Sequence, residues 1–120
     1  MSKIIQAINA MISNPAFITD VHEHELEYFF LYKGKYKWSI KVAEDTINLW
    51  FYPGLQSLDE LVHTRDWQYI PMIHYSSKDI GTKEAKASLN ELYNLVKEKL
   101  YSVDKVLDDI IADLEDDLPF

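Results

Sequence analysis

A strict alternation of apolar and polar side chains between residues 35 and 42 is the feature that most constrains the fold. The apolar positions Tyr36, Trp38, Ile40 and Val42 alternate with the polar positions Lys35, Lys37, Ser39 and Lys41. Side chains of a β-strand point alternately to its two faces, so this period of two indicates a strand with one buried face and one solvated face. A lone strand is not stable, so the chain must contain a sheet.

Three further strands are predicted, one before the alternating segment and two after it. Residues 25–32 are rich in aromatic side chains, and the turn Lys33-Gly34-Lys35 joins them to the alternating segment. Residues 67–75 have the composition of a fourth strand, in which Pro71 favours an edge position or a bend. Residues 17–21 are assigned to a connecting segment.

The third strand of the predicted sheet follows a turn at residues 43–45 and covers residues 47–52. Its odd-numbered positions are apolar and face one way, whereas Trp50 and Tyr52 face the other way. These two aromatic residues either form an exposed patch or pack beneath a helix, and packing is the more common arrangement.

Helical periodicity predicts the remaining elements. Apolar stripes with a helical period follow the N-cap candidates Ser2, Thr82 and Ser102, and Ser57 opens a capping box for a short helix. The resulting order, α-β-β-β-(α)-β-α-α, predicts an α+β fold. We expect a small antiparallel sheet of three to four strands, with an N-terminal helix and two C-terminal helices packed on it. We also expect one domain over residues 1–114 and an exposed tip over residues 115–120.

The distribution of charge separates the chain into a nearly neutral body and an acidic end. Residues 1–103 have a net charge of −2, whereas residues 104–120 contain Lys105 against seven acidic residues. An acidic end repels nucleic acid and attracts basic protein surfaces. The chain has no cysteine, no secretory signal and no apolar stretch long enough to span a bilayer, so we expect a cytoplasmic protein.

The last residues of the chain form a short motif. After an aspartate, a leucine and a glutamate, the chain ends in Asp116, Asp117, Leu118, Pro119 and Phe120. A terminal Phe carries an aromatic ring and a free carboxylate on one residue, so a partner can bury the ring and bind the carboxylate with an arginine. Pro119 keeps the backbone extended, which lowers the entropy lost on binding.

This ending resembles the conserved acidic tip of bacterial single-stranded DNA-binding proteins (SSB). The resemblance covers eight residues, and the remainder of the chain is not similar to the family's oligonucleotide-binding barrel. In the family the tip recruits helicases, exonucleases, primosome components and polymerase accessory subunits. The resemblance therefore implies a bacterial or phage accessory protein of DNA replication, recombination or repair that docks on SSB-interacting proteins. In the family the tip follows a long flexible linker, whereas here it follows a predicted helix almost directly, which restricts its reach.

Two alternative functions remain open. In the first alternative, the chain binds single-stranded DNA through Trp50 and the lysines of the first hairpin, and the acidic tail regulates this binding. The lysines are Lys33, Lys35, Lys37 and Lys41. The alternation places lysines and aromatic residues on opposite faces, so solvated lysines outside a core face are the simpler interpretation. The second alternative is an inhibitor that imitates DNA with the carboxylates of residues 104–117.

Catalytic and metal-binding motifs are absent from the sequence. No nucleophile motif, phosphate-binding loop or carboxylate pair stands out, so we expect no enzymatic activity and no cofactor. His22 and His24 have the spacing to share one strand face, but scattered histidines without cysteine are more often surface residues, and no metal site is predicted.

Overall fold

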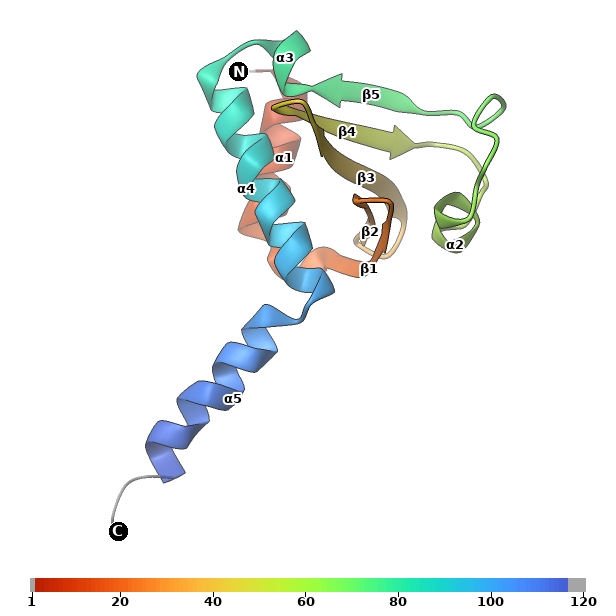
Figure 1. Cartoon of the computed structure of the whole chain (residues 1–120). Coiled ribbons are helices and arrows are strands. Elements are labelled where there is room, and N and C mark those ends of the chain that lie inside the picture. Colours follow the sequence, from red (N-terminus) through yellow and green to blue (C-terminus); the bar gives the residue numbers. More distant parts are fainter. Residues whose placement is uncertain (1, 117–120) are drawn as a thin grey trace.

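The structure, a computed structural model, describes residues 2–116, and the side chains of residues 2–114. Five antiparallel strands form one sheet in which the spatial order is the chain order (Figure 1). The strands are β1 (Ile18–His24), β2 (Glu27–Tyr32), β3 (Tyr36–Ala43), β4 (Thr46–Tyr52) and β5 (Ile73–Ser76). The α+β class and the antiparallel sheet agree with the sequence analysis, but the sheet has five strands rather than three to four.

Tight turns produce this simple order of strands. The loops Glu25-Leu26 and Glu44-Asp45 have two residues each, and all four residues have positive φ angles between 50° and 65°. Two left-handed residues in succession give a turn whose twist matches that of the flanking strands. Each strand therefore pairs with the strand that follows it in the sequence. The predicted turn at residues 33–35 is confirmed, and the one predicted at residues 43–45 is present at residues 44–45, because Ala43 is the last residue of β3.

The sequence analysis did not predict β1 as a separate strand. Residues 17–21 were assigned to a connecting segment, and His22 and His24 were considered for a strand face without a strand of their own. The pairing of β1 with β2 is interrupted by a bulge between Thr19 and His22, and Asp20 has a φ angle of 55°. A bulge inserts an extra residue into one strand and breaks the period-two pattern by which a strand is recognised. The last strand is also shorter than predicted, since β5 begins only at Ile73, two residues after Pro71.

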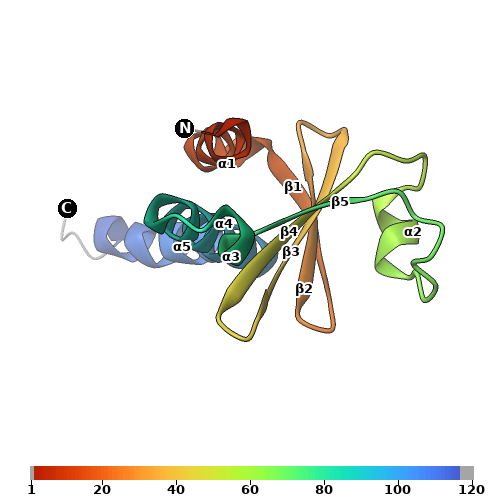
Figure 2. The same cartoon turned by 90° about the horizontal axis from the view of Figure 1, so that it is seen from above.

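Helices cover both faces of the sheet (Figure 2). On one face lie α1 (Lys3–Ser13) and α4 (Lys83–Leu100), and on the other face lies α2 (Leu58–Val62). A 3-10 turn (Pro15–Phe17) and α3 (Ser77–Ile80) are short connections. Three of the predicted caps are present, since the side chains of Ser2, Ser57 and Thr82 accept hydrogen bonds from the backbone at the starts of α1, α2 and α4.

The sheet therefore separates two apolar cores. The larger core joins α1 and α4 to the sheet and includes Ile8, Phe30, Ile40, Leu49 and Leu92. The smaller core lies beneath α2 and contains Phe29, Tyr52, Leu58, Leu61 and Val62. The prediction that one sheet face is solvated is thus wrong. The short α2 and the loop after it cover that face.

The last helix, α5 (Val103–Asp116), extends away from the body (Figure 1). The sequence analysis expected it to pack on the sheet, and that part of the prediction is wrong. Between α4 and α5 the chain changes direction at Ser102, which has a φ angle of 52°. Among the described helices, none is long and apolar enough to cross a bilayer.

Candidate functional site

The candidate tip is attached to the far end of α5. Asp116 is the last residue of this helix, while Asp117, Leu118, Pro119 and Phe120 lie outside the described residues. A helix of 14 residues is about 20 Å long. The attachment point of the tip is therefore displaced from the body by about that distance.

Two chemically different faces run along α5. Its apolar side chains are between 49% and 70% exposed at Val106, Leu107, Ile110, Ile111 and Leu114. Such a stripe, with spacings of three and four residues, is typical of a helix that packs against another surface. A contiguous apolar surface left open on a soluble protein commonly marks a site of interaction.

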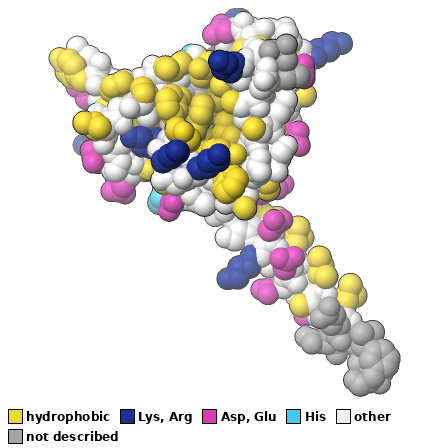
Figure 3. All heavy atoms as spheres, turned by 180° about the vertical axis from the view of Figure 1, so that it is seen from behind, with side chains coloured by type: hydrophobic (Ala, Val, Ile, Leu, Met, Phe, Trp, Pro, Cys, Tyr) yellow, Lys and Arg dark blue, Asp and Glu magenta, His cyan; other side chains and the backbone are white. Residues whose placement is uncertain are grey.

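The rest of the α5 surface is acidic. Asp104, Asp108, Asp109 and Asp113 are exposed on this helix, and Lys105 is its one basic residue. At 100° per residue, Asp104 and Asp113 lie on opposite flanks of the apolar stripe. Figure 3 shows the hydrophobic side chains on one side of α5 and the acidic ones on the other.

The lysines of the β2–β3 hairpin do not form one basic row. Lys33 and Lys35 are exposed in the turn and lie over the rings of Phe17 and Tyr36, at 5.6 and 4.8 Å from the ring centroids. Lys37 is half-buried on the opposite face of the sheet, where its ammonium group donates hydrogen bonds of 2.6 Å to the carbonyl oxygens of Gly54 and Gln56. The expectation that Lys37 is solvated is therefore wrong, because this lysine anchors the loop that leads into α2.

Lys41 and Trp50 also lie on the face of the sheet that carries α2. Lys41 is half-buried on β3. Trp50 is half-buried against the smaller core, and its ring stacks on His74 with centroids 4.9 Å apart and an interplanar angle of 19°. Of the two arrangements left open for Trp50 and Tyr52, packing beneath a helix is the one observed.

A buried polar group on the same face was not predicted. Ser39 has no exposed surface, and its hydroxyl donates to Glu27 Oε2 at 2.5 Å and lies 2.7 Å from the Tyr52 hydroxyl. Burial raises the pKa of Tyr52 above its usual range, and the nearby Glu27 carboxylate acts in the same direction. These contacts give the buried hydroxyl groups of Ser39 and Tyr52 hydrogen-bond partners, which buried polar groups in folded proteins generally have.

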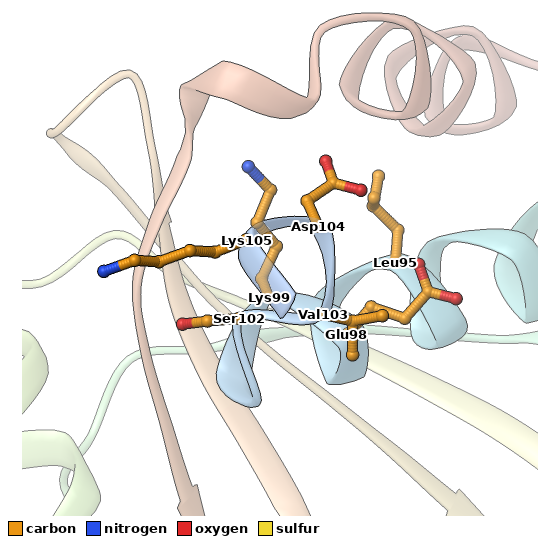
Figure 4. Close-up of a pocket in the computed structure, with 7 residues that line it drawn as sticks. All are labelled: Leu95, Glu98, Lys99, Ser102, Val103, Asp104 and Lys105. Carbon is orange, nitrogen blue, oxygen red and sulfur yellow. The ribbon is translucent and has the colours of Figure 1, made fainter. Parts of the chain in front are cut away.

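A pocket of about 240 Å³ lies at the junction of α4 and α5 (Figure 4). Its lining includes Glu98, Lys99, Asp104 and Lys105. In Figure 4 the charged ends of these side chains point in different directions rather than toward a common point. Catalytic groups must converge on one reacting atom, so this pocket has the geometry of a cleft between two helices.

The histidines do not gather into a metal site. His22 and His24 are exposed on β1, at one edge of the sheet. His63 directly follows α2, and His74 lies on β5, at the other edge of the sheet. Within residues 2–114, no three His, Asp or Glu side chains are arranged so that they could hold a metal ion.

No protein-family model matches the chain, and neither a curated protein nor a solved structure is similar enough to count as a match.

Proposed function

We propose that this chain is an accessory or modulator protein of bacterial or phage DNA replication, recombination or repair, and that it docks on SSB-interacting proteins through its C-terminal tip. The observation that carries the proposal is the ending Asp116-Asp117-Leu118-Pro119-Phe120, which resembles the SSB tip position by position. The partners would be helicases, exonucleases, or primosome or polymerase accessory subunits, as the resemblance implies.

The chemistry of docking follows from the residue types. The Phe120 ring would enter an apolar pocket of the partner, while its carboxylate would pair with an arginine at the pocket edge. Leu118 adds a second apolar contact. Asp116 and Asp117 would meet a basic rim, which mainly accelerates the encounter and makes it dependent on salt.

The direction of α5 supports this proposal. The helix displaces the attachment point of the tip by about 20 Å from the body, so the bulk of the sheet does not stand beside it. Exposed aspartates along α5 extend the negative charge of the tip toward the body. A partner with a basic rim would thus be attracted by the helix as well as by the tip.

The same aspartates favour a second candidate function, inhibition by imitation of DNA. Asp104, Asp108, Asp109 and Asp113 are exposed along one helix. In that case, reversing their charges should abolish activity even when Phe120 is retained, whereas a docking tip should tolerate the change with weaker, more salt-dependent binding.

The proposal is tested with a purified exonuclease or helicase of the class that binds SSB tips. Removing residues 118–120 should leave the circular dichroism spectrum and the melting temperature unchanged and abolish binding to the enzyme in calorimetry. The matched control keeps the composition and charge but permutes the last five residues, and it should also fail to bind. A truncated chain that binds the enzyme as tightly as the full chain would refute the proposal.

A further inference from the structure

The face of the body shown in Figure 3 carries an apolar area with basic side chains at its border. A hollow of about 380 Å³ opens between α1 and the end of the β2–β3 hairpin. Ala7 and Ala10 of α1 line one side of it, and the aromatic side chains Tyr36, Trp38 and Phe51 line the other. Alanine methyl groups on α1 leave this space unfilled, and the helix does not cover the aromatic side chains.

The segments that build the hollow contain no carboxylates on this face. Residues 3–19, 28–43 and 46–58 contain no Asp or Glu. Glu27 begins β2, but its carboxylate is bound by Ser39 beneath the opposite face. Lys33 lines the hollow and Lys35 lies over the Tyr36 ring, so the rim is basic.

An apolar hollow with a basic rim fits a ligand that combines an aromatic ring with several carboxylates. The aromatic walls favour edge-to-face or stacked contact with a ring, and the lysines favour nearby carboxylates. The C-terminal segment of this chain has that combination, since residues 113–120 contain four acidic side chains, two leucines and a terminal Phe. One chain thus carries both an apolar hollow with a basic rim and a segment that combines apolar and acidic side chains.

We propose that the hollow binds the C-terminal segment of a second copy of this chain. The chain's own tip cannot reach it while α5 keeps its direction. The helix carries residue 116 about 20 Å from its junction with α4, and four more residues span at most about 14 Å. The contact joins two different surfaces of two copies, so it either closes reciprocally as a two-fold dimer or generates a larger ring or an open chain of molecules.

Self-association of this kind would compete with docking on a partner, because one tip cannot occupy two pockets. The inference uses the same tip as the proposed function but needs no partner enzyme. Each can therefore fail while the other holds. A chain that binds its partner enzyme but never itself overturns the inference alone, and a chain that binds itself but no SSB-interacting enzyme overturns the proposed function alone.

The binding test uses a synthetic peptide of residues 111–120 with a fluorescent label at its amino end. The receptor is the full chain with Phe120→Ala, so that its own tip does not compete. We expect a saturable rise in fluorescence anisotropy. Lys33→Glu with Lys35→Glu should weaken binding by at least about ten-fold, because both rim charges are reversed. Ala10→Trp should weaken it similarly by filling the hollow.

The matched control reverses two exposed lysines on α4, Lys86→Glu and Lys97→Glu, and should change binding by less than about three-fold, since it alters net charge equally but lies away from the hollow. The peptide with an amidated end tests the carboxylate of Phe120 and should bind more weakly. Absence of binding, or equal weakening by the control and rim variants, would overturn the proposal. Circular dichroism verifies that every variant is folded.

Sedimentation velocity of the full chain decides the identity of the occupant. The average mass should rise with concentration up to about 100 µM and should remain that of a monomer for the Phe120→Ala chain. If the peptide binds but the full chain stays monomeric throughout this range, the hollow serves another protein's acidic end. That outcome would overturn the assignment to a second copy.

Discussion

The ring of Trp38 on β3 lies against the ring of Phe51 on β4, with centroids 4.9 Å apart and an interplanar angle of 48°. The two residues are direct partners in the β3–β4 pairing. Two positions further along β3, Ile40 is fully buried beneath the helices, whereas Trp38 and Phe51 are only half-buried. Along β3, the same face of the sheet is therefore buried at Ile40 and partly exposed at Trp38.

Substitutions in α4 and α5 should have very different effects on stability. Leu92 is fully buried in the larger core, so Leu92→Ala should lower the free energy of unfolding by about 2–5 kcal/mol. Leu107 is 49% exposed on α5, so Leu107→Ala should change it by less than about 0.5 kcal/mol. Urea unfolding followed by circular dichroism measures both, and equal losses would mean that α5 packs on the body.

Lys37 should stabilise the loop before α2. Lys37→Met keeps the apolar stem but removes the hydrogen bonds to Gly54 and Gln56, which should cost about 1–2 kcal/mol. Amide hydrogen exchange should accelerate over residues 54–62. The control is Lys41→Met on the same strand, which should leave exchange in this segment unchanged. Identical exchange in the two variants would contradict an anchoring role.

Stability should decrease at high pH. Burial, with a contribution from Tyr93, raises the pKa of Tyr28 from about 10 to about 12. Above pH 10 the unfolded chain releases this proton first, so the free energy of unfolding falls between pH 10 and pH 12, and burial of Tyr52 adds to the effect.

The measurement for this pH dependence is urea unfolding at several pH values. Tyr28→Phe should flatten the decline because the ionising group is gone. Tyr69 is 79% exposed, so Tyr69→Phe is the control and should leave the profile as it is in the unmodified chain. A decline of the same size in all three proteins would exclude Tyr28 as its source.

Variants of the tip should weaken partner binding in a defined order. Phe120→Ala should cost about 2 kcal/mol or more, as for a buried aromatic hot spot. One glycine added after Phe120 should be nearly as harmful, because it displaces the carboxylate while retaining every side chain. Asp116→Asn with Asp117→Asn should mainly slow association at low salt. Isothermal titration and stopped-flow mixing measure these effects, and the reverse order would favour charge mimicry.

Single-stranded DNA provides a separate test. A DNA-binding hairpin with a regulatory tail predicts that deletion of residues 115–120 increases affinity for an oligonucleotide and that affinity falls steeply with salt. Because Lys37 is bound to backbone carbonyls and Trp50 is stacked on His74, we expect no binding with or without the tail. Anisotropy of a labelled oligonucleotide in low salt decides between the two outcomes.

Local signals in the sequence predicted much of the fold. The caps Ser2, Ser57 and Thr82 and the turn at Gly34 were found because each depends on a few adjacent residues. The strand β1 was missed because its bulge at Asp20 breaks the alternation. Ser39 was expected to face solvent, since an alternating pattern does not reveal that a distant helix covers the polar face and that Glu27 supplies a partner.

The candidate site was predictable only where it is a contiguous motif. The tip could be proposed from the sequence because Asp116, Asp117, Leu118, Pro119 and Phe120 are adjacent to one another. The apolar stripe of α5 indicated burial, but periodicity does not specify what a helix packs against. The hollow combines residues as distant as Ala7 and Phe51, and no local pattern in the sequence brings them together.

The change of direction at Ser102 separates two parts of the chain in which substitutions have different structural consequences. Substitutions along α5 have little access to the two cores, so this helix can drift, lengthen or acquire new charges without loss of the folded sheet. Each residue inserted into it would turn the tip by about 100° and move it by about 1.5 Å. The helix and its ending can thus be regarded as a transplantable module, which protein engineers could graft onto another small domain.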